Sequence, residues 1–291
     1  MPYSWAWLTD GVVLSASTKA GRDGIAALLD RPAQALVAFD YDGTLAPIVA
    51  DPLQAYPHPR VVPALADLSR HVGLVAIITG RPAGLAVDLA RLAGVAGLDR
   101  LVILGHYGLE RWEAGSGKVQ SAALPAGLDA VRRALPRLLD SLGAGRADIE
   151  DKGLSVAVHV RRLDDPVGMF AAVKGPLREL AEQHGLAAEP GKMVVELRPR
   201  GMDKGVALRR LVTEVRATVV AFTGDDLGDM SAFAEVERLR AEGFDGLRIC
   251  SGSDEVTALR QQADLVVDGP AGVVQWIEEL VDQLDRRRPV W

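Results

Sequence analysis

Short apolar runs that stop abruptly at Gly or Asp recur along this chain, and they constrain its fold more than any other feature. The runs are LVAF (36–39), LVAIIT (74–79), LVILG (101–105), VVAFTG (219–224), LRICSG (247–252) and DLVVDG (264–269). Runs without polar alternation are typical of strands that are buried on both faces. Because helical segments separate them, the order predicts an α/β fold with a doubly wound, Rossmann-like parallel sheet.

Between residues 112 and 198 the pattern changes, because polar and apolar residues alternate there. In SVAVHVR (155–161) the valines share one face, and KMVVELR (192–198) alternates in the same way. Such alternation predicts an antiparallel sheet with helices on its apolar face and polar side chains on the other. We therefore expect a core of residues 1–111 and 199–291, interrupted by an inserted α+β cap domain at 112–198.

Composition excludes several classes of protein. The chain has 291 residues, of which 48% are hydrophobic and 25% charged, as in ordinary globular proteins. A net charge of −6 argues against a nucleic-acid binder, and the single cysteine excludes disulfides and cysteine-based zinc sites. No apolar run approaches the ~18 residues that span a membrane. No Lys or Arg precedes Lys19, and Asp10 interrupts the first apolar stretch, so we expect no secretory signal. We expect a cytoplasmic, monomeric enzyme that acts on a small molecule.

The first apolar run ends in Asp40-Tyr41-Asp42-Gly43-Thr44. Two carboxylates one residue apart beside a buried strand are costly to hold without a cation or a proton. An Asp-rich turn alone would explain the pattern. A calcium EF-hand loop would need Gly where Leu45 stands, and a nucleotide-binding loop would need a glycine cradle that is absent here. The other strand ends must decide between these readings.

Further polar signals stand at or beside strand ends, where open α/β sheets bind ligands. They are Thr79 with Gly80-Arg81, Lys204 in GMDKG, and Asp225, Asp226 and Asp229. Carboxylates from two strands that share one crevice suit Mg²⁺. A hydroxyl and an ammonium suit a phosphate. Each signal alone has an ordinary structural explanation, but together they indicate phosphoryl chemistry.

These segments carry a resemblance. DYDGT, ITGR, DKG and GDDLGD resemble, in order, the four motifs of the haloacid dehalogenase-like phosphohydrolases, with the insertion between the second and third. Four longer blocks, LGHYGLE (104–110), EDKGLSVAVHVR (150–161), GKMVVELRPRGMDKG (191–205) and GDDLGDMSAF (224–233), are similar to the trehalose-6-phosphate phosphatase family. The resemblance covers about residues 36–269. The chain departs from it at Gly228 and Met230, where Thr and Glu are expected, and at Tyr107, where His is more usual.

The resemblance implies a Mg²⁺-dependent phosphatase that hydrolyses trehalose 6-phosphate to trehalose and phosphate through an aspartyl-phosphate. By chemistry and by this resemblance, Asp40 is the expected nucleophile and Asp42 the general acid and then base. Thr79 and Lys204 are expected to hold phosphoryl oxygens. The expected metal site comprises Asp40, Asp42 through its backbone carbonyl, Asp225, and Asp229 in support.

Substrate selectivity is expected in the cap, since hydroxyls are recognised by paired polar groups. The predicted substrate-binding residues are Arg81, Lys152, His159, Arg161, Lys192 and Glu196, among which the resemblance singles out Lys152, Lys192 and Glu196. Glu150 and Arg198 share the polar sheet faces. Alternatives remain open: a capped phosphatase for sucrose phosphate or a mannosyl phosphate, a phosphomutase, or a non-catalytic sugar-phosphate-binding domain.

Overall fold

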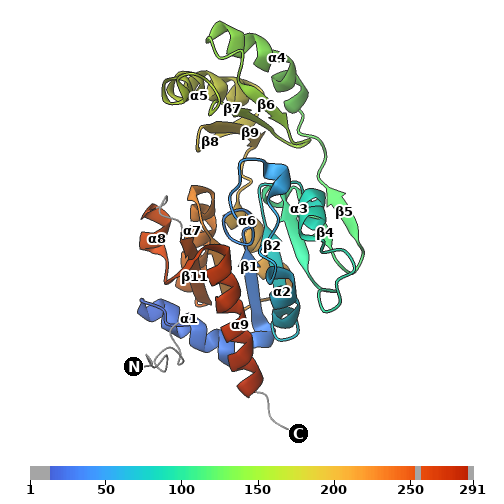
Figure 1. Ribbon diagram of the computed structural model, residues 1–291, viewed down its shortest axis with the longest axis vertical. Coiled ribbons are helices and arrows are strands. Elements are labelled where there is room, and N and C mark those ends of the chain that lie inside the picture. Colours follow the sequence, from blue (N-terminus) through green and yellow to red (C-terminus); the bar gives the residue numbers. More distant parts are fainter. Residues whose placement is uncertain (1–13, 253–256, 288–291) are drawn as a thin grey trace, which may run out of the picture.

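The computed structural model describes residues 14–252 and 257–287, and it contains two separate sheets (Figure 1). In the described residues the larger sheet has eight strands in the order β12-β11-β10-β1-β2-β3-β4-β5. Their bounds are β1 Ala35–Phe39, β2 Leu74–Ile78, β3 Val102–Gly105, β4 Glu110–Glu113, β5 Lys118–Ser121, β10 Val219–Gly224, β11 Asp245–Gly252 and β12 Leu265–Asp268. Strands β12 to β3 are parallel, and β4 and β5 are antiparallel additions at one edge.

Helices cover both faces of the larger sheet. One face carries α1 (Lys19–Asp30), α2 (Val61–Ser69), α3 (Ala83–Ala90) and α9 (Gly269–Arg287); the other carries α6 (Lys204–Val215), α7 (Met230–Ala241) and α8 (Thr257–Gln262). Phe39 of β1 packs edge-on against Trp276 of α9, whereas Phe222 of β10 packs edge-on against Phe233 of α7. The two apolar layers explain why the central strands lack polar alternation. The prediction of a doubly wound parallel sheet is confirmed.

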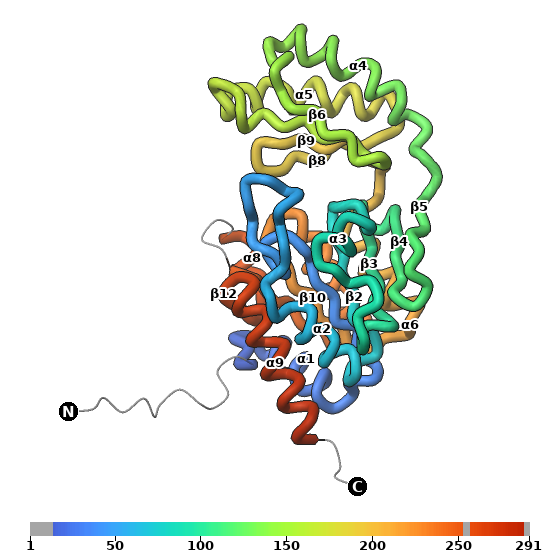
Figure 2. Tube along the Cα trace, turned by 45° about the vertical axis from the view of Figure 1, so that its right-hand side comes forward, coloured from blue at the N-terminus to red at the C-terminus, as the bar shows by residue number. Residues whose placement is uncertain are grey.

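The second sheet is antiparallel and has the order β6-β7-β9-β8. Its strands are β6 Asp148–Asp151, β7 Val156–His159, β8 Leu186–Gly191 and β9 Val194–Pro199, and its helices are α4 Leu128–Ser141 and α5 Pro166–Gln183. Val156 and Val158 are buried in one cluster with Leu135 of α4 and Leu177 of α5. Figures 1 and 2 show both helices on the side of this sheet away from the core, so its other face is directed toward the core. The predicted antiparallel sheet with helices on its apolar face is confirmed.

The predicted start of the insertion at residue 112 is wrong, because that position lies inside β4. Strand β4 pairs with β3 and β5 pairs with β4, so residues 110–121 belong to the larger sheet. Alternation begins here because β4 and β5 form an antiparallel edge whose exposed face carries polar residues. We therefore place the first boundary after β5. The second predicted boundary, before residue 199, falls at the end of β9.

Short 3₁₀ turns complete the described chain: η1 Pro32–Gln34, η2 Pro52–Gln54, η3 His106–Gly108 and η4 Leu227–Asp229. No helix in the described ranges is both long and apolar enough to cross a membrane. The expectation of no secretory signal concerns residues 1–13, which lie outside the described residues.

Candidate active site

The site lies at the carboxyl ends of the two central strands, β1 and β10. Phe39 is paired with Thr223, and the backbone N–H of Asp40 donates to the Thr223 carbonyl at 2.8 Å. Each strand then runs into an aspartate, Asp40 after β1 and Asp225 after β10. Neighbouring parallel strands end at the same edge, so residues that are far apart in the chain are brought together there.

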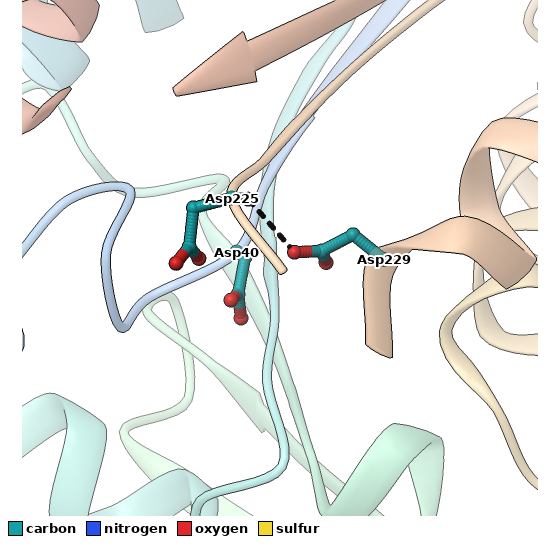
Figure 3. Close-up of side chains that lie close together, drawn as sticks. All are labelled: Asp40, Asp225 and Asp229. Atoms are coloured by element: carbon teal, nitrogen blue, oxygen red, sulfur yellow. Dashed lines mark hydrogen bonds between the residues drawn. The ribbon is translucent and has the colours of Figure 1, made fainter. Parts of the chain in front are cut away.

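Asp40, Asp225 and Asp229 form a buried acidic cluster, drawn in Figure 3. One carboxylate oxygen from each lies within 4.8 Å of the others. Burial raises the pKa of Asp40 well above its usual range, against the opposing attraction of Lys204. Burial, with the charges of Asp229 and Asp226, raises the pKa of Asp225 to about 8. At neutral pH such carboxylates stay ionised only if cations compensate them.

Lys204 supplies part of that compensation. Its ammonium nitrogen lies 2.8 Å from Asp40 Oδ1 and 2.7 Å from Asp229 Oδ1. Burial alone would lower the pKa of Lys204, but Asp229 and Asp40 outweigh it and raise the pKa well above its usual value. Lys204 is the first residue of α6, where the Asp203 side chain accepts from the Val206 N–H and fixes the helix start. One ammonium does not balance three carboxylates, so the site fits a divalent cation as well.

The carboxylates differ in how they could serve such a cation. Asp229 Oδ2 accepts the backbone N–H groups of Asp225 and Asp226, at 2.9 and 3.2 Å, while its Oδ1 faces Lys204. Both oxygens of Asp229 are therefore engaged, which suits a supporting position. Asp226 is exposed and accepts from the Gly228 N–H. The all-oxygen donors Asp40 and Asp225 fit Mg²⁺ best.

Gly43 allows the turn after β1 to approach Asp225 closely. Its φ is +70°, and a Cβ at this position would lie 2.0 Å from Asp225 Oδ2. Ser251 of β11 holds the turn by donating its hydroxyl to the Gly43 carbonyl at 2.7 Å. The glycine is therefore required both by backbone conformation and by the space beside the acidic cluster.

We expect Gly43→Ala to displace Asp225 and to weaken Mg²⁺ binding by roughly tenfold or more, the scale seen for disturbed supporting groups. The matched control is Gly117→Ala in the β4–β5 turn, where φ is +65° but nothing lies within 4 Å of the new Cβ. Calorimetric Mg²⁺ titration of both variants separates displacement of Asp225 from backbone strain. Equal Mg²⁺ affinity in the two would contradict the displacement.

Asp42 lies at the rim of the site instead of inside the acidic cluster. Its carboxylate is 39% exposed and forms a two-pronged ion pair with Arg81, whose Nε donates to Oδ2 and Nη2 to Oδ1, both at 2.6 Å. In the Asp40-Tyr41-Asp42 turn, the Asp42 carboxylate is thus held by Arg81, whereas the Asp40 carboxylate faces Lys204. Arg81, which we expected to contact substrate, is engaged with Asp42 here.

Thr79 follows β2, the strand next to β1, and is buried. Its hydroxyl oxygen accepts the Arg81 N–H at 3.1 Å, and its carbonyl accepts the Tyr107 N–H at 3.0 Å. Because the hydroxyl oxygen is occupied as an acceptor, its own proton is left to donate to a ligand oxygen.

Two of the predicted cap residues, Glu196 and Lys152, lie where the cap contacts the core. Glu196 of β9 is buried; its Oε1 accepts from the Ser155 hydroxyl and lies 3.5 Å from the Lys152 ammonium. The Tyr107 hydroxyl of η3 donates to Glu196 Oε2 at 3.2 Å, and the Arg198 guanidinium lies 3.9 Å from the Tyr107 ring centroid. Lys152 and Glu196 therefore meet the core through Tyr107.

Tyr107 was not among the predicted site residues. The sequence marked it only as a departure from the family motif. Its φ is +57° and that of His106 is +47°, conformations that are uncommon outside glycine and concentrate at functional sites. The remaining predicted cap residues form other contacts: His159 pairs with Glu150 at 2.9 Å, and the Arg161 guanidinium donates to the Lys192 carbonyl at 3.4 Å.

Comparisons with known proteins agree with this fold. The C-terminal domain of trehalose-6-phosphate phosphatase from Candida albicans shares the fold with a TM-score of 0.74, at 21% identity, covering 92% of this chain and 99% of that one. A haloacid dehalogenase-like hydrolase from Bacteroides thetaiotaomicron also shares the fold, with a TM-score of 0.60 at 16% identity, covering 84% of this chain and 98% of that one. The sequence model of the trehalose-phosphatase family matches residues 38–266, and this chain belongs to that family.

Two curated relatives support the assignment. A trehalose-phosphate phosphatase of Mycobacterium marinum is 34% identical over 262 residues, which is 87% of this chain and 62% of that protein. The trehalose-6-phosphate phosphatase of Escherichia coli is 30% identical over 255 residues, covering 86% of this chain and 88% of that protein. The chain thus spans less than two thirds of the mycobacterial relative's length.

Proposed function

We propose that this chain hydrolyses trehalose 6-phosphate to trehalose and phosphate, with Mg²⁺, through an aspartyl-phosphate on Asp40. One observation carries the proposal: a buried acidic and basic cluster at the strand ends lies below Tyr107, which contacts the inserted sheet at the buried Glu196 and its half-buried partner Lys152. The first part suits a phosphoryl group and the second a polyhydroxylated sugar. The proposal includes action as a monomer in the cytoplasm.

Asp40 is the nucleophile in this proposal. Its carboxylate forms a bond to phosphorus as the bond to the sugar oxygen breaks, and Asp42 gives that oxygen a proton. Water then attacks the aspartyl-phosphate, Asp42 takes its proton, and phosphate leaves. The Lys204 ammonium and the Thr79 hydroxyl hold phosphoryl oxygens. A Mg²⁺ ion held by Asp40, the Asp42 carbonyl and Asp225 would neutralise charge, so that one anion can approach another. Phosphate-monoester hydrolysis needs up to ~10²¹-fold acceleration, which makes dense electrostatics a requirement.

Glu196→Ala tests the sugar half of the proposal. An unpaired buried partner costs about 1–3 kcal/mol, so kcat/KM for trehalose 6-phosphate should fall roughly tenfold to a hundredfold. The kcat/KM for p-nitrophenyl phosphate, which is too small to reach the cap, should stay nearly unchanged. Glu182→Ala, at an exposed position of α5 on the opposite side of the cap sheet, is the control and should alter neither.

An equal loss with both substrates would place Glu196 in the phosphoryl site or in the fold. No loss with either would remove the main support for a sugar substrate. A panel of sugar phosphates, with released phosphate as readout, separates trehalose 6-phosphate from sucrose phosphate and mannosyl phosphates. Turnover without phosphate release would instead indicate a phosphomutase, and binding without turnover a regulatory domain.

A further inference from the structure

Arg81 binds Asp42 in a geometry that leaves few of the arginine N–H groups for another ligand. The two parallel hydrogen bonds from Nε and Nη2 engage both carboxylate oxygens, the arrangement in which a planar guanidinium recognises a carboxylate most specifically. The Arg81 side chain is only 11% exposed, so the ion pair is shielded from solvent on the arginine side. Two-pronged geometry makes such a pair more stable than an ordinary surface pair.

The remaining contacts of Arg81 fix it to the segment that follows the aspartate turn. Nη1 donates to the Pro52 carbonyl at 2.7 Å, and the guanidinium lies 5.4 Å from the Tyr41 ring centroid. Tyr41 is itself buried and donates its hydroxyl to the Ala55 carbonyl at 3.0 Å. Arg81 therefore ties the aspartate turn, through Asp42 and Tyr41, to the loop at 52–55.

The phosphoryl side of the site has a different cation. Lys204, not Arg81, contacts Asp40 and Asp229 within 2.8 Å. We propose that Arg81 is a positioning residue that acts through Asp42: it holds the Asp42 carboxylate in one orientation at the rim. In that orientation Asp42 takes a proton from solvent, gives up one of the two hydrogen bonds to Arg81, and donates the proton to the departing sugar oxygen. The proposal rests on the proton-transfer role of Asp42 given above, and it replaces the expected direct contact between Arg81 and substrate.

Leaving-group dependence separates this role from phosphate binding. A sugar alkoxide needs a proton to depart, whereas p-nitrophenolate does not, and kcat/KM reports the steps up to leaving-group departure. General acid catalysis contributes about 10²–10⁴-fold, so Arg81→Ala should lower kcat/KM for trehalose 6-phosphate by roughly tenfold to a hundredfold. With p-nitrophenyl phosphate the change should stay within about threefold, because the acid is not needed there. Affinity for inorganic phosphate, measured by calorimetry in the presence of Mg²⁺, should not change.

Asp42→Asn completes the test as a double-mutant cycle. If Arg81 acts through Asp42, then Arg81→Ala should add less than about twofold to the loss already caused by Asp42→Asn, because coupled residues are not additive. Arg81→Lys, which keeps the charge but not the two-pronged geometry, should give an intermediate loss with the sugar phosphate only. Arg60→Ala removes a surface pair with Glu278 and is the control for loss of an arginine. Thermal unfolding of each variant shows whether it is folded.

Equal losses with both substrates, weaker phosphate binding and additivity with Asp42→Asn would overturn the proposal and place Arg81 on the phosphoryl group. An unchanged kcat/KM for trehalose 6-phosphate in Arg81→Ala and Arg81→Lys would overturn it as well, because the ion pair would then have no part in catalysis. If Asp42→Asn lowers kcat/KM for trehalose 6-phosphate no more than for p-nitrophenyl phosphate, the acid role of Asp42 is wrong. The additivity of the cycle then still decides whether Arg81 acts through Asp42.

Discussion

Asp40→Asn should abolish phosphate release from trehalose 6-phosphate, by about 10⁴-fold or more, the scale of losing a nucleophile. An amide cannot form the acyl-phosphate. Asp42 is paired with Arg81, and both oxygens of Asp229 already accept hydrogen bonds, so neither is placed to replace the lost nucleophile. The measurement is phosphate release with trehalose 6-phosphate and with p-nitrophenyl phosphate, both of which need the nucleophile.

The fold should survive this change. Asparagine has the shape of aspartate, and the backbone N–H of residue 40 still reaches the Thr223 carbonyl. Burial raises the pKa of Asp40 by more than the attraction of Lys204 lowers it, so the ionised carboxylate opposes folding at neutral pH and its removal should not lower the unfolding temperature. Asp99→Asn makes the same chemical change before β3, at the amino ends of the strands, and should leave turnover intact. Normal turnover in Asp40→Asn would remove Asp40 from the nucleophile role.

Removal of Mg²⁺ should stop turnover, and its return should restore it. Burial raises the pKa of Asp40 and of Asp225, so without a metal these carboxyl groups bind protons near neutral pH, and a protonated Asp40 cannot attack phosphorus. The measurement is phosphate release after treatment with EDTA and dialysis, and again after addition of Mg²⁺. Full activity in metal-free buffer would contradict the proposed Mg²⁺ site.

The same cluster makes a pH-dependent prediction about the stability of the metal-free protein. The pKa of Asp225 is about 8 in the folded chain against an ordinary 3.8, so between these values the folded state binds the extra proton. The stabilising contribution of the protonated group is present below pH 3.8 and is lost as the pH rises toward 8. Asp40 and Asp229 shift in the same direction.

If the proposed Mg²⁺ site is correct, Mg²⁺ would take the place of those protons and should raise the unfolding temperature more at pH 8 than at pH 6. Thermal unfolding with and without Mg²⁺ at the two pH values measures this difference. Asp225→Asn is the internal control, since it removes the carboxyl group whose pKa is raised to about 8 and should reduce the difference. A Mg²⁺ effect that is the same at both pH values would contradict proton displacement.

Local sequence signals were sufficient for the strands and for the acidic edge of the sheet. Apolar runs predicted the strands because β1 and β2 are buried along their whole length. The acidic residues after the strands could be grouped because all parallel strands end at one edge. By contrast, alternation could not separate a cap strand from a core edge strand. That ambiguity is why the insertion was started at 112, inside β4.

The sequence by itself therefore determined the class of fold, the presence of an insertion, and a set of carboxylates, one lysine and one threonine suited to a phosphoryl group. These follow from hydrophobic periodicity and from residue type, which are local properties. Only the tertiary structure decided that Arg81 takes both oxygens of Asp42, that Tyr107 joins Glu196 to the core, and that Asp229 turns toward Lys204. Partners of this kind are chosen by rotamers and by contacts between segments 25 to 89 residues apart, and no local pattern encodes them.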